Sequence, residues 1–127
     1  MDKRIIETTQ SPAPIGPYSQ AVLANHTLYI SGQIALHPVT GELANQDIQA
    51  ETHQVMQNLK AILLQAELTF GHVVKTTIYL TDMELFSDVN TIYAQYFEGE
   101  FPARETIAVR GLPKGVQVEI SMIATVA

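Results

Sequence analysis

The sequence predicts a β-sheet that is covered on one of its faces by two helices. Apolar residues recur at helical spacing in two segments, from about residue 45 to 66 and from Leu85 to Phe97. Segments with strand-like alternation or β-branched composition precede, separate and follow these two helices. Because two helices can cover only one face of such a sheet, the other face is left without a helical layer.

The first part of the chain is expected to hold an ordered loop and three short strands. The segment SPAPIGPYSQ contains three prolines within six residues, which fix φ and remove backbone donors, so it predicts an extended loop. The segments QAVLA and LYISG are typical of strands that pair through a tight turn at NHT. A further short strand is expected near residues 4–7, and HPVTGE is typical of a turn.

The middle of the chain predicts a helix, a strand and a second helix. The apolar stripe of the first helix is Ile48, Val55, Leu59, Ile62 and Ala66. The segment HVVKTTIYL is rich in β-branched residues and predicts a strand. Thr81 and Glu84 match the S/T-x-x-E capping box, which predicts the start of the second helix. Gly99 and Pro102 predict its end.

Two further strands close the predicted sheet. RETIAVR alternates weakly, whereas VQVEISMIATV alternates strongly and places apolar residues on one face. The other face of this last strand is mixed, and it carries Gln117, Glu119, Ser121, Ile123 and Thr125. A sheet face that is neither fully apolar nor fully charged often meets another subunit, so we expect a closed cyclic oligomer.

Length, composition and charge narrow the class of protein. The 127 residues predict one domain, residues 1–127. The absence of cysteine excludes disulfides, thiolate zinc sites and cysteine nucleophiles. The net charge of −6 and the scattered basic residues disfavour nucleic-acid binding. The sequence shows no signal-peptide pattern and no apolar run near the ~20 residues of a membrane span, so we expect a soluble, cytoplasmic protein that does not contact a membrane.

No metal and no organic cofactor are expected. The histidines lie at predicted turns or on a helix surface, lack metal-ligand spacing and are all expected to be solvated: His26, His37, His53 and His72. The sequence contains no Gly-rich phosphate loop, no P-loop and no serine nucleophile elbow. Hydride transfer and ATP chemistry therefore have no support in the sequence.

Two charged residues are candidates for chemistry. Arg104 follows Pro-Ala at the head of a strand, and its planar guanidinium suits a carboxylate. It would either hold an anion or pair with a local acid at a strand edge. Glu119 is a lone carboxylate in the most apolar strand, where burial would raise its pKa and allow it to exchange protons with water. Its alternative role is a structural salt bridge to Arg104 or Arg110.

Two hydroxyl groups are further candidates. Tyr18 follows Gly-Pro in the rigid loop, and Ser31 ends a strand next to Gly32. Both hydroxyls would either bind a small polar ligand or form structural hydrogen bonds.

Six sequence blocks resemble the RidA family, also called the YjgF family. They are APIGPYSQA, YISGQIALHPVTGE, NLKAIL, VVKTTIYLTDMELFSDVNTIYAQYF, FPAR and LPKGVQVEI, and the resemblance spans about residues 11–124. It implies a chorismate-mutase-like α+β fold, with a mixed sheet, two helices on one face and a homotrimer with clefts between subunits. It also implies cofactor-free hydrolysis of reactive enamines and imines to 2-oxo acids and ammonia, with 2-aminoacrylate, 2-iminopropanoate and 2-iminobutanoate as substrates.

The resemblance also implies roles for individual residues. Arg104 would bind the substrate carboxylate, and Glu119 would position and activate the hydrolytic water. The other positions that match the family's cleft, as substrate-binding residues, are Tyr18, Ser31, Gly32, Asn90 and Thr106.

This chain departs from the family pattern in three ways that bear on the substrate range. Glu105 follows Arg104 where relatives usually carry a small residue or cysteine, and normal strand alternation would point it away from the cleft. Thr106 replaces a common cysteine, and the loop FEGEFPAR is shorter than in many relatives. The same resemblance leaves two alternatives open: a regulatory trimer that binds metabolites in this cleft, and an RNA-acting or chaperone-like protein.

Overall fold

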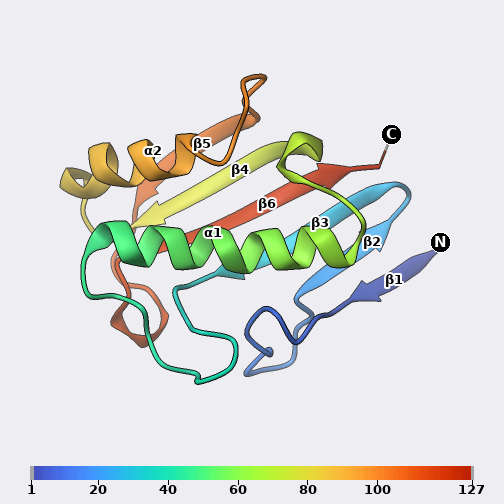
Figure 1. Cartoon of the computed structure of the whole chain (residues 1–127), viewed down its shortest axis with the longest axis horizontal. Coiled ribbons are helices and arrows are strands. Elements are labelled where there is room, and N and C mark those ends of the chain that lie inside the picture. The colour runs from blue at the N-terminus through green and yellow to red at the C-terminus, as the bar shows by residue number, and fades with distance from the viewer. Residues whose placement is uncertain (1, 127) are drawn as a thin grey trace.

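A computed structural model describes residues 2–126 of the chain. Six strands form one sheet in the order β1-β2-β3-β6-β4-β5 (Figure 1). Their bounds are β1 Lys3–Ile6, β2 Ala21–Ala24, β3 Thr27–Gln33, β4 Val73–Leu80, β5 Ala103–Ala108 and β6 Val118–Thr125. The strands β4 and β5 run parallel and the other neighbours antiparallel. The sheet is therefore mixed, as the resemblance implied.

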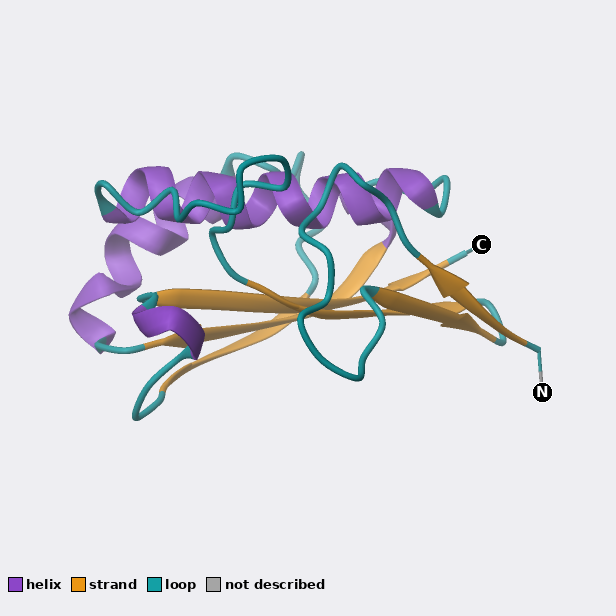
Figure 2. Cartoon of the chain, turned by 90° about the horizontal axis from the view of Figure 1, so that it is seen from below, coloured by secondary structure: helices purple, strands orange, loops and turns teal. Residues whose placement is uncertain are grey.

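Two helices, α1 (Ile48–Gln65) and α2 (Phe86–Ala94), lie on the same face of this sheet. Figure 2 shows both helices on one side of the strands, while loops lie on the opposite side. The predicted α+β architecture is confirmed. Within residues 2–126, neither helix combines the length and the apolarity that a membrane crossing requires.

The core lies between the helices and the sheet. Along β6 the burial alternates, so that Val118, Ile120 and Met122 are buried while the residues between them are only half-buried. The helix α1 contributes its apolar stripe, of which Leu59 and Ile62 are fully buried. Burying a side chain of this size stabilises the fold by about 1.5–3 kcal/mol. Along β6, this period-2 alternation therefore separates a core face from an open face of the sheet.

The start of the second helix differs from the prediction. Asp82, not Thr81, supplies the cap, because its Oδ1 accepts a hydrogen bond from the Glu84 N–H at 2.8 Å. A single 3-10 turn follows, and α2 then begins at Phe86. A reciprocal capping box does occur earlier, where Thr69 and His72 cap the 3-10 turn before β4. The predicted Thr81–Glu84 box is wrong because the neighbouring aspartate is a stronger cap.

Candidate active site

Strand alternation places Arg104 and Glu105 on opposite faces of the sheet. Along the parallel pair β4–β5, Arg104 lies opposite Thr76 and Glu105 lies opposite Thr77. Thr76 is fully buried on the helix-covered face, so Arg104 lies on that face as well. Glu105 therefore lies on the open face.

The helix α2 holds the Arg104 guanidinium in place. Its Nη1 donates a hydrogen bond to Asn90 Oδ1 at 2.7 Å. Its Cζ lies 5.6 Å from the ring centre of Phe86 and 5.2 Å from that of Tyr93. These three residues share one face of α2, because they are spaced four and three residues apart. Cation–π contacts of this kind contribute about 0.5–2 kcal/mol.

Tyr93 is itself fixed to the sheet. Its hydroxyl donates to Thr76 Oγ1 at 2.9 Å, and the ring is almost completely buried. Burial raises the pKa of the Tyr93 hydroxyl, against opposing effects of the Thr76 hydrogen bond and the Arg104 charge. Tyr93 thus stays neutral near pH 7 and acts as a rigid wall for the guanidinium.

Arg104 has no acidic partner within residues 2–126, where the ion pair formed is between Lys75 and Glu105. The alternative of a local salt bridge is therefore not realised among the described residues. A cavity of about 390 Å³ lies beside the guanidinium, and its lining residues are Asn90, Tyr93, Ala94, Phe101, Pro102 and Arg104. The guanidinium N–H groups that do not reach Asn90 are available to an anion.

Thr106 lies two residues beyond Arg104 on the same face of β5. Its Oγ1 is buried and has no hydrogen-bond partner within residues 2–126. A buried hydroxyl without a partner costs about 1–3 kcal/mol. Thr106 therefore presents an unused hydrogen-bonding group on the strand that carries Arg104.

Glu119 lies in a different cavity, on the opposite face of the sheet. It pairs with Tyr79 across β4–β6. Tyr79 is three residues from Thr76 along β4, so the two side chains lie on opposite faces of the sheet. The cavity has a volume of about 430 Å³, and Tyr18, Ser31, Gly32, Pro113 and Glu119 are among its lining residues. Four of the predicted site residues therefore meet in one place.

The Glu119 carboxylate packs directly on the backbone of Gly32. A Cβ atom at position 32 would overlap Glu119 Oε2, so a residue other than glycine would force the carboxylate to shift. Glu119 is half-buried, and this desolvation raises the pKa of its carboxyl group. The alternative of a salt bridge to Arg104 or Arg110 is not formed in the described chain.

The two hydroxyl candidates differ in their contacts. Ser31 Oγ donates to the Ser19 carbonyl at 2.6 Å, so this hydroxyl has a structural role and remains free only as an acceptor. Tyr18 is 51% exposed at the edge of the cavity. Its hydroxyl makes no hydrogen bond to residues 2–126. Tyr18 is therefore the more available of the two groups.

Gln20 is an important residue that the sequence reading missed. It is 2% exposed, and its Oε1 accepts from Thr8 N–H at 2.7 Å. Its Nε2 donates to the carbonyls of Thr8 at 3.0 Å and Pro12 at 2.8 Å. The available signal was the proline content of the loop, because a loop that lacks N–H donors needs a side chain to satisfy its carbonyls.

Replacing Gln20 with leucine is expected to lower the free energy of unfolding by about 2–3 kcal/mol. The reason is that several buried or part-buried backbone groups of the loop would lose their partner. Urea denaturation measures the loss. The matched control is Gln10→Leu, at an exposed position of the same loop. Equal stability of the two variants would contradict this role for Gln20.

The histidine prediction was partly wrong. His53 is half-buried, and its Nδ1 lies 2.8 Å from the Tyr96 hydroxyl. His72 is half-buried as well, and its Nδ1 accepts from the Thr69 N–H at 3.0 Å. His26 and His37 are exposed, as predicted. Within the described residues, no three His, Cys, Asp or Glu side chains are grouped to hold a metal ion.

Glu105 does not approach the Arg104 guanidinium. Its Oε2 accepts from Thr77 Oγ1 at 2.7 Å, and its Oε1 lies 3.2 Å from Lys75 Nζ. The Thr77 hydrogen bond, together with Lys75, lowers the pKa of the Glu105 carboxyl group. Within one chain, Glu105 therefore does not repel an anion at Arg104.

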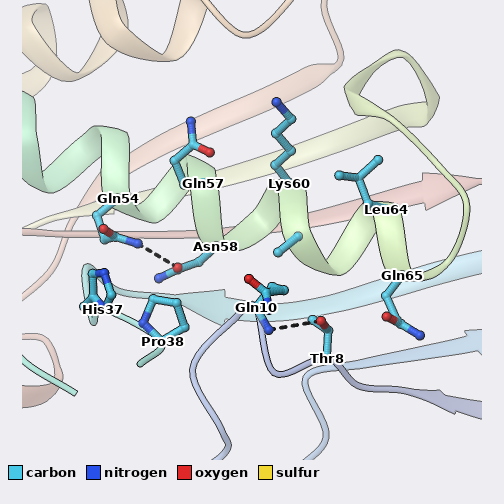
Figure 3. Close-up of a pocket in the computed structure, with 11 residues that line it drawn as sticks. Thr8, Gln10, His37, Pro38, Gln54, Gln57, Asn58, Lys60, Leu64 and Gln65 are labelled. Atoms are coloured by element: carbon cyan, nitrogen blue, oxygen red, sulfur yellow. Dashed lines mark hydrogen bonds between the residues drawn. The ribbon is translucent and has the colours of Figure 1, made fainter. Parts of the chain in front are cut away.

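A third hollow, of about 480 Å³, lies between α1 and two loops and contains none of the predicted site residues. Figure 3 shows Gln54 and Asn58 of α1 facing His37 and Pro38 across it. Asn58 accepts from Gln54 and donates to the carbonyls of Ile34 and Leu36, so its amide is fully used in holding the loop. This hollow is therefore the groove in which the loop packs against α1.

The predicted residues thus form two groups that one chain does not bring together. Arg104, Asn90 and Thr106 belong to the helix-covered face and its edge strand. Glu119, Gly32 and their neighbours belong to the other cavity, which shares no lining residue with the first.

The fold and these two groups define a class of α+β proteins. In this class, an arginine without an acidic partner among the described residues and a desolvated carboxylate lie on opposite faces of one sheet. The chain belongs to the RidA/YjgF/L-PSP family, because the family described as Endoribonuclease L-PSP matches residues 8–126. A Homo sapiens protein named 2-iminobutanoate/2-iminopropanoate deaminase is 47% identical over 96% of this chain and 89% of its own length.

Two further relatives support this assignment. The crystal structure of YyfA from Yersinia pestis, a protein of the Rid family, has a TM-score of 0.96 and 52% identity, covering 98% of this chain and all of that one. A Lactococcus lactis protein named putative regulator AldR is 49% identical over 97% of this chain and 98% of its own length. The fold agreement extends over nearly the whole chain.

Proposed function

We propose that this protein hydrolyses 2-imino acids, such as 2-iminopropanoate and 2-iminobutanoate, to 2-oxo acids and ammonia. The observation that carries the proposal is the Arg104 guanidinium, which is fixed by Asn90 and two aromatic rings yet has no acidic partner in the described chain. An imino acid supplies the carboxylate that such a guanidinium binds. The naming of several close relatives as imine deaminases supports the same reaction.

The proposed site lies between subunits of a homotrimer. Arg104 and Glu119 face opposite sides of one sheet, so a site that uses both draws them from two chains. The open face has the exposed apolar surface that an interface requires, since Tyr29 is 50% and Ile107 is 43% exposed there. A neighbouring subunit would then place its Glu119 cavity against the Arg104 edge of this chain.

The proposed mechanism needs one anion-binding group and one proton carrier. Arg104 holds the substrate carboxylate by paired hydrogen bonds and keeps the C=N group in one orientation. Glu119 accepts a proton from a water molecule as the water oxygen bonds to the imine carbon, and it then gives this proton to the imine nitrogen. In the resulting carbinolamine, Glu119 takes the hydroxyl proton and passes it to the amino group as the C–N bond breaks, which releases ammonia and the 2-oxo acid. A carboxyl group whose pKa is raised by burial suits both proton transfers.

The remaining residues shape the proposed cleft. Gly32 leaves room for the Glu119 carboxylate, and Tyr18 offers a free hydroxyl at its edge. Ser31 offers only acceptor capacity, because its proton is used on Ser19. The unpartnered Thr106 hydroxyl would complete the anion site beside Arg104.

A competition assay tests the proposal. A threonine dehydratase generates the imine from threonine or serine, and semicarbazide traps it as a coloured semicarbazone. The purified protein is expected to suppress semicarbazone formation. A folded protein that leaves the trapping rate unchanged would contradict the proposed activity.

Mixing subunits of two inactive variants tests the shared site. Arg104→Ala and Glu119→Gln chains are denatured together and refolded, so that mixed trimers form. Some clefts then combine an intact Arg104 with an intact Glu119, and partial activity is expected to return. Each variant refolded alone is the control. Inactive mixed trimers, with exchange verified by native mass spectrometry, would show that both residues act from one chain.

A second candidate is a regulatory trimer that binds 2-oxo acids without catalysis. The observation that favours it is the 49% identity to a protein named as a putative regulator. Calorimetric titration with 2-oxobutanoate, beside the trapping assay, separates the two. Saturable binding without suppression of trapping would favour regulation.

A further inference from the structure

A buried carboxylate in the first turn of α1 takes no part in the proposed chemistry. Glu51 is 1% exposed, and within residues 2–126 it forms no ion pair. Its Oε2 accepts hydrogen bonds from the backbone N–H of Gln117 at 2.7 Å and of Val118 at 3.0 Å. A buried carboxylate without a cation is costly unless hydrogen bonds satisfy it. Here two amides at the start of a strand do so.

These two amides immediately precede Glu119. The strand β6 begins at Val118, after a turn in which Lys114 and Gly115 have left-handed φ values of 57° and 68°. The carbonyl of Gln117 accepts from the Thr81 N–H at 3.1 Å, so the start of β6 is bonded from two sides. Among residues 2–126, the hydrogen bonds that join this point to a side chain of the helical layer are those to Glu51.

The Glu119 carboxylate lies against the backbone of Gly32. It packs so closely there that a single added methyl group would overlap it. Pro113, in the turn before β6, lines the same cavity. A shift in the start of β6 would therefore change both the contact with Gly32 and the exposure of the carboxylate to water.

We infer that Glu51 is a positioning residue for Glu119, because it fixes the backbone two residues before the carboxylate that is proposed to activate water. The catalytic consequence of this inference rests on the proposed function. Its structural part does not, since the ionisation of Glu119 can be followed without substrate.

Three variants separate position from charge. Glu51→Asp keeps the charge but is too short to reach the amides. Glu51→Gln keeps an oxygen acceptor at the same reach but removes the charge. Gln117→Pro removes one amide donor at an exposed position, and the preceding Val116 already has the extended ψ of 165° that proline favours. Gln117→Pro still tests the positioning role if Glu51→Asp does not fold.

The first readout is a ¹³C NMR titration of the Glu119 carboxyl group, assigned with Glu119→Gln. The Asp and Pro variants are expected to lower the pKa of Glu119 toward that of a solvated carboxyl group, because the carboxylate gains water. Glu51→Gln is expected to leave it closer to the wild-type value. The matched control is Thr52→Val, which removes a buried hydroxyl that bonds only within α1.

The second readout is kcat/KM in the trapping assay, with a loss of up to about 100-fold expected in the Asp and Pro variants. If these variants lose thermal stability but retain the wild-type titration of Glu119 and the wild-type kcat, Glu51 is a structural residue only. If the wild type itself has no deaminase activity, the proposed function fails, while the NMR titration still decides the positioning role.

Discussion

Arg104→Ala is expected to lower kcat/KM for imine hydrolysis by roughly 100- to 10,000-fold, while the protein keeps its fold. Hydrogen bonds to a charged group contribute about 1.5–3 kcal/mol each, and the guanidinium would make two to the substrate carboxylate. Arg104→Lys keeps the charge but not the planar fork, so an intermediate loss is expected. The semicarbazide trapping assay measures both variants.

Glu105→Gln is the matched control for this experiment. Its side chain lies on the opposite face and contacts Lys75 and Thr77 rather than the guanidinium. Activity close to that of the wild type is expected. A large loss in this variant together with near-normal activity in Arg104→Ala would remove Arg104 from the site.

Glu119→Gln is expected to abolish most of the activity and at the same time to stabilise the folded protein at neutral pH. General acid–base catalysis contributes about 100- to 10,000-fold, and glutamine cannot accept a proton from water. The gain in stability follows from the raised pKa of the Glu119 carboxyl group in the fold. At neutral pH the charged form is held in a site that disfavours it.

The sign of the pH effect follows from linkage. A carboxyl group whose pKa is higher in the folded than in the unfolded state favours folding while it is protonated. This contribution is present below the unfolded pKa and is lost as pH rises toward the folded pKa. Thermal unfolding from pH 4 to 7 is therefore expected to show a falling contribution in the wild type, and Glu119→Gln is expected to remove it. Identical pH profiles would contradict a perturbed Glu119.

The local structure could be predicted from the sequence because its patterns were strong. The alternation of the last strand placed Glu119 on the face away from the core residues. Normal alternation also correctly predicted that Glu105 and Arg104 lie on opposite faces of the sheet. The capping prediction failed because adjacent Thr81 and Asp82 both suit a helix start, and only the backbone geometry shows which one caps it.

Other features depend on contacts that no local pattern shows. Glu51 looks like a solvated residue of an amphipathic helix, yet it reaches amides that lie 66 residues away in the sequence. Gln20 likewise looks like a polar residue at a strand start, whereas it is buried against the proline-rich loop. The placement of Arg104 and Glu119 on opposite faces of the sheet could not be predicted from the sequence. It depends on the strand order and register, which show which residues of different strands share a face.

The contact between Gly32 and Glu119 has an evolutionary consequence. One nucleotide converts a glycine codon into an alanine codon, and the added methyl group would displace the carboxylate while leaving Arg104, on the far side of the sheet, untouched. A lineage could thus exchange a catalyst for a receptor of the same metabolites in a single mutational step. In such a lineage, the residue at position 32 would decide whether the Glu119 carboxylate keeps its place in the cleft.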